Sequence, residues 1–344
     1  MASVERATVV VDETETPMTG REERRQTPVR TPVALIAFNR PDKTARVLSE
    51  IVKAEPSKLF VIADGPRPNH PEDVAKCRAV RELIERVDWK CEVLKNYSDV
   101  NLGCGRRPAS GISWVFEHVE EAIILEDDTV PHPSFFSFCD ELLEKYRHDE
   151  RVMMIGGFKI CDRPMPYSYH FSRVPPCLGG WATWRRAWQY WDGRLALWPK
   201  LRDDTSWLSD IMEDPRAVEY WRTVFEKAYT DFRVADYWDY QWMFACWVQG
   251  GLAILPTTGH LISNIGFDAD ATHTKSGADR RSSLPTIEMR FPLRHPPYVM
   301  RDKAVDRACL VREIPAQANF ETTLARFDRR FLGGNLRIFK KFLW

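Results

Sequence analysis

Short apolar runs alternate with segments of helical periodicity over residues 32–126. The apolar runs are PVALIAFN from Pro32, KLFVIADG from Lys58, CEVLKNY from Cys91 and EAIILEDD from Glu121. Between them, DKTARVLSEIVKA, PEDVAKCRAVRELIERV and PASGISWVFEHVE carry apolar residues at the spacing of one helical face. Apolar strands that alternate with amphipathic helices predict a parallel sheet with helices on both faces. The predicted fold class is therefore α/β, with a Rossmann-like, mostly parallel sheet.

After residue 130 the regular alternation of predicted strands and helices ends. PSFFSFCDELLEKYRHDE predicts a helix, RVMMIGGF a strand, residues 206–229 a helical segment, DYWDYQWMFACWVQGG a helix, and LAILPTTGHLISNIGF a strand and loop. Residues 240–267 carry no formal charge, but Gln249, the Gly250-Gly251 pair and Pro256 interrupt the run. A buried helix followed by a buried strand therefore fits this stretch better than a membrane span.

Polar residues follow the ends of the predicted strands. Asn39, Asp64 and Asn101 stand at or just beyond three of these ends, and Glu126, Asp127 and Asp128 end the fourth run. Ligands of parallel sheets bind at the carboxyl ends of the strands, so the polar residues are expected to converge on one edge.

The three consecutive acids have two interpretations. A solvated acidic turn would explain an isolated Glu-Asp-Asp. At the end of a buried strand, the same acids suit Mg²⁺ or Mn²⁺, which prefer oxygen ligands and take remaining ligands from water and substrate phosphates. The position after the fourth strand favours the metal site.

The segment NLGCGRRPASG, residues 101–111, carries three glycines and two arginines before a predicted helix. Gly103 would allow close backbone approach, the helix N-terminus favours an anion, and Arg106 or Arg107 can add paired hydrogen bonds to phosphate. No G-K-[ST] follows, so the segment is not a Walker loop. Taken alone, such a segment is more often a tight turn than a phosphate-binding loop.

Composition narrows the class of protein. The chain has 344 residues, with 49 Lys and Arg against 49 Asp and Glu, so no global field favours nucleic acid or anionic lipid. Eight cysteines without a C-x-x-C pair predict reduced thiols in a cytoplasmic protein. Most of the 13 tryptophans fall between Trp181 and Trp247, where they form either core or a groove for flat ligands such as sugars.

A family resemblance rests on several short motifs in a fixed order. These are ALIAFNRP, VIADGP, NLGCGRR, AIILEDD followed by PSFF, LGGWATWRRAW and WDYQW, within residues 32–275. The chain resembles GT-A fold glycosyltransferases of family 2, in the hemolytic-protein-like branch, and more distantly the N-acetylglucosaminyltransferase I type. A long insertion between Trp198 and Trp238 departs from the latter, in the half where acceptors bind.

The resemblance implies roles for individual residues. Asn39 and Arg40 would contact the nucleotide, Asp64 the base, and Glu126 and Asp127 the donor sugar and ribose. Asp128 would ligate Mn²⁺ or Mg²⁺, and His273 would complete the metal or phosphate shell, although a histidine in a polar loop is as often incidental. The donor-binding set predicted in this way is Asn39, Arg40, Asp64, Asn101, Gly103, Arg106, Arg107, Glu126, Asp127 and Trp181.

Inverting transfer needs a base for the acceptor hydroxyl, while a metal can take up the charge of the leaving diphosphate. Asp239, between Trp238 and Tyr240, is the predicted base, and Asp236 is the nearby competitor. Either could instead be an acid that favours a helix N-terminus.

The predicted activity is metal-dependent transfer of a sugar from a nucleotide diphosphate sugar, UDP-linked with UDP-GlcNAc as one candidate, to an acceptor hydroxyl. A sugar nucleotidyltransferase and a carbohydrate-binding protein with a relic site are the alternatives. The predicted division is a disordered tail (1–30), a nucleotide-sugar half (31–129), an acceptor-binding and catalytic half (130–280) and a C-terminal extension (281–344). That extension ends in NLRIFKKFLW, which is expected to pack on the body, with a peripheral membrane anchor or dimer contact as alternatives.

Overall fold

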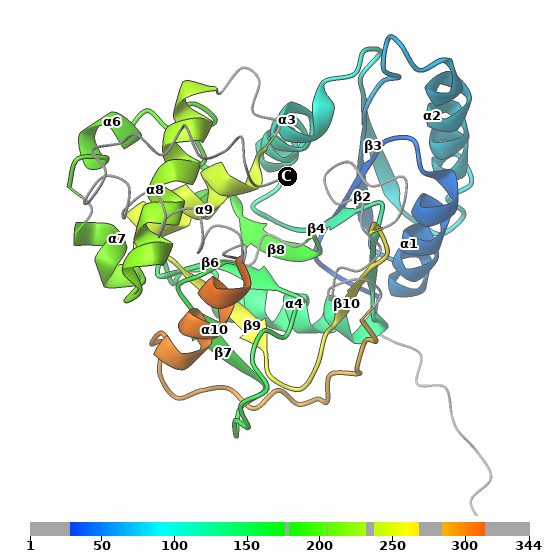
Figure 1. Cartoon of the computed structure of the whole chain (residues 1–344). Helices are drawn as coiled ribbons and strands as arrows, with labels where there is room; N and C mark the ends of the chain where they lie inside the picture. The colour runs from blue at the N-terminus through cyan, green and yellow to red at the C-terminus, as the bar shows by residue number, and fades with distance from the viewer. Residues whose placement is uncertain (1–27, 176–178, 205, 232–236, 268–283, 314–344) are drawn as a thin grey trace, which may run out of the picture.

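The computed structural model describes residues 28–175, 179–204, 206–231, 237–267 and 284–313 (Figure 1). Its centre is an eight-stranded sheet of order β3-β2-β1-β4-β8-β6-β9-β7. Its strands are β1 (Val33–Ala37), β2 (Lys58–Ala63), β3 (Glu92–Tyr97), β4 (Glu121–Glu126), β6 (Val152–Gly156), β7 (Tyr169–Ser172), β8 (Trp181–Trp184) and β9 (Leu252–Pro256). The four strands from β3 to β4 are parallel, as is the pair β6–β9, whereas β8 and β7 pair antiparallel with their neighbours.

Helices cover both faces of the sheet and create two cores. On one face, α1 (Pro41–Ala54) and α4 (Pro133–Lys145) bury their apolar side chains, with a contribution from α2 (Pro71–Ile84). On the other face lie α3 (Gly103–His118), α5 (Arg185–Trp188), α7 (Ser206–Ile211), α8 (Pro215–Thr230) and α9 (Asp239–Val248). In Figure 1, α1 and α2 flank β1–β3, and α6 (Trp198–Leu201) to α9 stand at the opposite end of the sheet.

The pleat explains why β1 is apolar throughout. In β1, Val33 and Leu35 belong to the core under α1 and α4, while Ala34 and Ile36 belong to the core under α3. Both faces of the strand are therefore buried, and a continuous apolar run is required. The predicted α/β fold class, with a mostly parallel sheet and helices on both faces, is confirmed.

The uncharged stretch 240–267 forms the buried helix α9 and the buried strand β9, as predicted. The Trp-rich stretch contributes β8, and Ile262–Asn264 (β10) pairs antiparallel with Thr129–Pro131 (β5), which the apolar pattern did not predict. Within the part of the chain that the structure describes, no helix is long and apolar enough to cross a membrane.

The helical segment predicted over residues 206–229 is divided. It breaks between α7 and α8, where the Asp214 side chain accepts a hydrogen bond from the backbone N–H of Arg216 (2.9 Å) and Pro215 opens α8. Aspartate at the N-cap with proline at the first helical position is a favoured helix start, and this local signal ended the first helix.

The C-terminal extension is described as far as α10 (Lys303–Glu313), which packs beside β7. Buried Asp306 ties it down by accepting from Ser172 Oγ (2.7 Å), the Arg173 N–H (2.8 Å) and Arg301 Nε (2.7 Å). Residues 314–344, with the predicted anchor or dimer contact, and residues 1–27 of the predicted tail lie outside the described residues. Val29, in contrast, is part of the core under α1.

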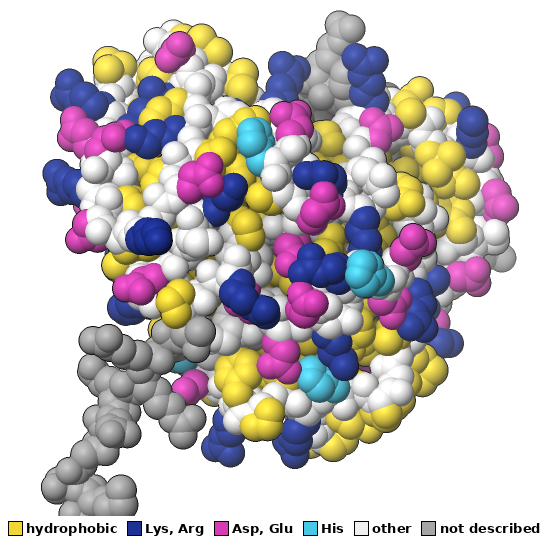
Figure 2. Space-filling model, turned by 180° about the vertical axis from the view of Figure 1, so that it is seen from behind, with side chains coloured by type: hydrophobic (Ala, Val, Ile, Leu, Met, Phe, Trp, Pro, Cys, Tyr) yellow, Lys and Arg dark blue, Asp and Glu magenta, His cyan; other side chains and the backbone are white. Residues whose placement is uncertain are grey.

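The face opposite the view of Figure 1 carries Lys and Arg side chains interspersed with Asp and Glu (Figure 2). This mixture accords with the equal numbers of basic and acidic residues in the chain.

Candidate functional site

Parallel pairing brings the predicted polar residues to one edge of the sheet. Ile36 of β1 is in register with Glu126 of β4, and Ala37 of β1 with Ala63 of β2. The residues that follow these positions are Asn39 and Arg40 after β1, Asp64 after β2, and Asp127 and Asp128 after β4. The predicted convergence at the carboxyl edge is therefore present.

The acidic turn is held by main-chain and hydroxyl contacts. Thr129 Oγ1 accepts from the Glu126 N–H and donates to the Glu126 carbonyl, both at 2.9 Å. The Ile265 N–H donates to the Asp128 carbonyl at 2.8 Å, which fixes the chain after β10 against the turn. The turn is thus built into the fold, and Asp127 and Asp128 are buried at 2% and 8% exposure. The solvated-turn interpretation does not fit these side chains.

Arg40 pairs with both buried aspartates. Its guanidinium donates to Asp128 Oδ2 (2.9 Å) through Nη1 and to Asp127 Oδ1 through Nη2. Asp127 Oδ2 accepts from the Phe38 N–H (3.1 Å). Burial raises the pKa of Asp127, and the Arg40 charge opposes this rise. One cation and one main-chain donor therefore compensate the carboxylates of the turn.

The charges of Asp128, Arg40 and Asp127 also act on Glu126. Burial, followed by the charge of Asp128, raises the pKa of Glu126. The charge of Asp239 adds to this rise. The predicted base at the start of α9 is therefore electrostatically coupled to the acidic turn, although 113 positions of sequence separate it from Glu126.

Asp239 is the first residue of α9 and is half-buried. Its Oδ1 accepts from the Tyr240 N–H at 3.0 Å, the contact of an acid in the first turn of a helix. The competitor Asp236 and the predicted shell residue His273 lie outside the described residues.

Asp128 meets the requirement for a divalent cation at one atom. Its Oδ1 is buried and has no hydrogen-bond partner, although its Oδ2 pairs with Arg40. The described residues contain no cluster of three His, Cys, Asp or Glu side chains that would form a complete protein cage. Mg²⁺ and Mn²⁺ in phosphate-transfer sites use few carboxylates and take other ligands from water and substrate. The donor set therefore fits a cation held by Asp128 and completed by a phosphorylated ligand.

Gly266 leaves room for the Asp128 carboxylate. A Cβ built on Gly266 would stand 2.0 Å from Asp128 Oδ2 and 2.7 Å from Asp128 Cγ. The glycine is held in place by its N–H, which donates to Asn264 Oδ1 at 2.7 Å. Only a residue without a side chain fits against the proposed cation ligand.

Asp64 organises the glycine loop. Its carboxylate accepts from the backbone N–H groups of Gly65 (2.9 Å), Leu102 (2.9 and 3.1 Å) and Gly103 (3.0 Å), and from Asn101 Nδ2 (3.1 Å). Burial raises the pKa of Asp64, while these backbone donors lower it. The backbone N–H groups at the start of α3, which were expected to bind a phosphate, therefore donate to Asp64 instead. Asn101 and Gly103 both contact this carboxylate.

The two arginines of the glycine segment differ in exposure. Arg107 is buried, and its Nη2 donates to Asn96 Oδ1 (2.8 Å) and to the Asn96 carbonyl of β3. Arg106 is exposed on the first turns of α3. Of the pair, Arg106 is accessible to a ligand, whereas Arg107 ties α3 to the sheet.

Asn39 is held by a buried acid of α2. Asn39 Nδ2 donates to Asp73 Oδ1 (2.7 Å), and Arg67 Nε donates to Asp73 Oδ2 (2.7 Å). The Arg67 hydrogen bond is the largest cause that lowers the pKa of Asp73 to about 2. This network fixes the loop after β1, from which Arg40 reaches the acidic turn.

The tryptophans form core. Trp181 is 1% exposed, stacks on Trp238 (centroids 5.5 Å, planes 16° apart) and lies against Trp242 (5.7 Å) and Trp188 (6.1 Å). The Trp-rich stretch was expected to form either hydrophobic core or a groove for flat ligands. These four tryptophans belong to the hydrophobic core. Trp238 directly precedes Asp239, so this cluster supports the start of α9. The donor contact predicted for Trp181 remains a prediction.

Sequence reasoning missed Thr129, Gly266 and Asp73. A threonine after three acids is a local signal for a hydroxyl-stapled turn. Nothing local distinguishes Gly266, because its role depends on a side chain 138 positions away. Asp73 had the pattern of an ordinary first-turn acid of a helix.

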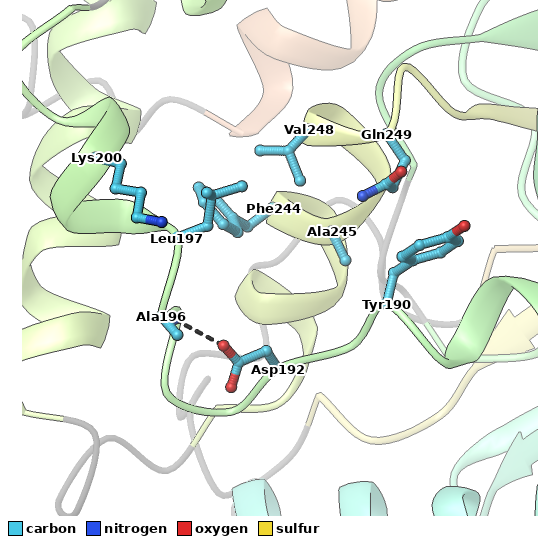
Figure 3. Close-up of a pocket in the computed structure, with 9 residues that line it drawn as sticks. All are labelled: Tyr190, Asp192, Ala196, Leu197, Lys200, Phe244, Ala245, Val248 and Gln249. Atoms are coloured by element: carbon cyan, nitrogen blue, oxygen red, sulfur yellow. Dashed lines mark hydrogen bonds between the residues drawn. The ribbon is translucent and has the colours of Figure 1, made fainter.

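A separate cavity of about 350 Å³ lies between residues 190–200 and the outer face of α9 (Figure 3). Phe244, Ala245 and Val248 form its apolar side, and Tyr190 and Lys200 stand at its rim. These α9 residues follow Asp239 by about 8 to 14 Å along the helix at 1.5 Å per residue. The cavity therefore lies farther along α9 than Asp239, and its lining includes none of the three acids of the turn.

Comparisons with known proteins give partial matches only. No protein-family model matches the chain, and no curated protein sequence matches it. Among solved structures it is similar to S. aureus TarS (9% identity, TM-score 0.38, 68% of this chain and 36% of that chain). It is also similar to TarS 1-349 in complex with UDP-GlcNAc (9%, 0.39, 68% and 57%) and to TarS 1-349 (10%, 0.38, 68% and 59%). The chain thus spans between about a third and three fifths of these relatives, and such a likeness assigns no function to it.

Proposed function

We propose that this protein is a metal-dependent glycosyltransferase that moves a sugar from a nucleotide diphosphate sugar, UDP-linked, to an acceptor hydroxyl with inversion. The observation that carries the proposal is the buried Asp127–Asp128 pair at the carboxyl edge of a parallel sheet, bridged by Arg40. Burial raises the pKa of the neighbouring Glu126, and the charge of Asp239 adds to this rise.

The diphosphate requires positive charge near the acidic turn. Arg40 supplies one cation at the turn, and exposed Arg106 is proposed to supply a second. A divalent cation held by Asp128 would supply charge compensation for the leaving nucleoside diphosphate, so no general acid is needed. His273 is the proposed additional ligand of the metal or phosphate.

The sugar and ribose would be held by groups of the turn. Glu126 is proposed to form a hydrogen bond with a hydroxyl of the donor sugar, and burial raises the pKa of its carboxyl group. Asp127 accepts from Phe38 and Arg40 and keeps the turn in register with β1.

The base of the nucleotide is proposed to lie near Asp64, Asn39 and Asn101. In the described structure Asp64 uses its oxygens on the 101–103 loop, so recognition of a uracil N–H would share these acceptors. Gly103 belongs to this loop and Arg107 ties α3 to β3, while Trp181 stacks on Trp238 at the start of α9; all three are proposed to shape the donor site.

Asp239 is the proposed general base. Its carboxylate takes the proton of the acceptor hydroxyl as that oxygen bonds to the anomeric carbon, and the bond from this carbon to the diphosphate oxygen breaks. Inversion follows because the acceptor attacks from the side opposite the leaving group.

The test is product analysis with a panel of UDP- and other nucleotide sugars, including UDP-GlcNAc, in the presence of Mn²⁺ and simple sugar acceptors. The proposal expects transfer of the sugar with release of nucleoside diphosphate. Formation of a nucleotide sugar from a nucleoside triphosphate would identify a nucleotidyltransferase instead. Sugar binding without Mn²⁺-dependent binding of any nucleotide would leave only the carbohydrate-binding alternative.

A further inference from the structure

Arg40 is positioned so that its backbone is fixed while its guanidinium contacts the acidic turn. Its carbonyl accepts from the Thr44 N–H (2.9 Å) and Thr44 Oγ1 (2.8 Å) in the first turn of α1. The side chain is 19% exposed and spans from this helix start to Asp127 and Asp128. The guanidinium can therefore change partners without a shift of the main chain.

The Arg40 guanidinium already pairs with the Asp128 carboxylate, which is the proposed ligand of the cation. Asp128 offers one oxygen without a hydrogen-bond partner, Oδ1, and one that Arg40 already compensates, Oδ2. A divalent cation that binds Asp128 would stand close to the positive charge of Arg40, and like charges at this range repel strongly in a buried site. A cation without an accompanying anion is disfavoured by this arrangement.

A diphosphate removes the conflict. The diphosphate of a nucleotide sugar brings two negative charges, and free UDP brings about three at neutral pH, because the second pKa of a terminal phosphate is about 6. These charges can compensate the cation, and the phosphate oxygens can accept hydrogen bonds from the guanidinium, for which Arg is geometrically suited. With Asp127 and Asp128 ionised, the site carries one net negative charge with Arg40 alone, and again one when a divalent cation and the diphosphate of a nucleotide sugar are added. Joint addition therefore avoids the excess positive charge that the cation alone would bring.

We propose that Arg40 is a resident counter-ion that competes with the divalent cation for Asp128, so that metal and nucleoside diphosphate bind cooperatively and the metal alone binds weakly. This inference rests on the proposed function, because it takes the acidic turn as the metal and donor site. In this role Arg40 disfavours binding of a cation to Asp128 without a diphosphate, in addition to contacting the nucleotide.

The test measures binding of Mn²⁺ by loss of the free-ion electron paramagnetic resonance signal, with Mn²⁺ alone and with added UDP. In the wild type, UDP is expected to raise Mn²⁺ affinity by a factor within the range of about 5- to 150-fold that is usual for coupled sites. Arg40→Met is expected to raise the affinity for Mn²⁺ alone by about tenfold and to lower the UDP-dependent factor.

A matched control is Arg301→Met. Arg301 is 18% exposed and pairs with Asp306, 2% exposed, which closely matches Arg40 and Asp127 at 19% and 3%. This control removes a comparable buried ion pair distant in sequence from the acidic turn and is expected to leave Mn²⁺ affinity unchanged.

If Arg40→Met does not fold, Arg40→Lys is tested in its place. A single ammonium group cannot bridge both carboxylates, so this variant is expected to gain affinity for Mn²⁺ alone, but less than Arg40→Met would. Unchanged or weaker binding of Mn²⁺ alone by the folded variant, while the wild type binds Mn²⁺ with UDP, overturns the inference and leaves the proposed function intact. Absence of Mn²⁺ binding by the wild type with and without UDP overturns both.

Discussion

His170 on β7 makes the stability of the protein depend on pH. The imidazole is 6% exposed, and neither ring nitrogen has a hydrogen-bond partner. Burial lowers its pKa from 6.5 to about 4, against a small opposing effect of Asp302. Because the folded pKa lies below the unfolded value, folding is undisturbed while the histidine is neutral, and stability is lost as pH falls from about 6.5 towards 4.

The magnitude follows from the two pKa values. The difference between these two pKa values corresponds to about 3 kcal/mol, since a tenfold change in an equilibrium constant is worth about 1.4 kcal/mol. At pH 5 the unfolded chain binds the proton almost completely and the folded chain hardly does, so about 2 kcal/mol of this is already lost. His170→Leu, of similar size, has no such titration and should retain this stability.

The assay is chemical denaturation of wild type and His170→Leu at pH 8 and pH 5, with the free energy of unfolding measured for each. Titration of all other groups is common to both proteins, so the wild type should lose about 2 kcal/mol more than the variant between these pH values. The exposed His148, replaced in His148→Gln, is the control and should behave as the wild type. Equal losses by wild type and His170→Leu, within about 0.5 kcal/mol, would refute the reasoning.

Three predictions concern the site. Gly266→Ala should displace the Asp128 carboxylate by about 1 Å and reduce turnover on the order of 10²-fold, and normal Mn²⁺-dependent UDP binding would contradict this role. Asp64→Asn places an amide N–H opposite the backbone N–H donors of the 101–103 loop, so the free energy of unfolding should fall by about 1–3 kcal/mol in chemical denaturation. The affinity for UDP should fall more than the affinity for pyrophosphate. Equal weakening of both ligands would show that Asp64 supports only the loop. Asp239→Asn should lower single-turnover transfer by about 10²- to 10⁴-fold with donor affinity unchanged, whereas a retained rate, with Asp236→Asn compared alongside, would remove Asp239 from the chemistry.

The sequence predicted the central strands of residues 31–129 well, because both faces of β1, β2 and β4 are buried. Val33–Ala37 and the inner part of β4, Ala122–Leu125, have no polar residue to blur the pattern, and the intervening helices have clear faces. Parallel strands then place their following residues on one edge, so the neighbourhood of Arg40, Asp64 and Asp128 could be predicted without knowing a single contact.

Specific partners could not be predicted. Arg40 and Asp128 are 88 positions apart, and only the register of β1 with β4 brings them together. Asp64 was expected to face a ligand, yet the glycine loop folds back onto its carboxylate, because the N-terminal donors of α3 require an acceptor. The Trp-rich stretch was ambiguous because tryptophan suits a core and a groove equally, and only burial of Trp181 and Trp242 distinguishes them.

The central claim is that the acidic turn binds a nucleoside diphosphate together with a divalent cation through Asp128. The most direct measurement is calorimetric titration of UDP into wild type and Asp128→Asn, each with Mn²⁺ and with EDTA. Mn²⁺ is expected to strengthen UDP binding by the wild type, EDTA to remove this gain, and Asp128→Asn to show no Mn²⁺ effect although it remains folded. Mn²⁺-dependent UDP binding of equal strength in Asp128→Asn would contradict this claim.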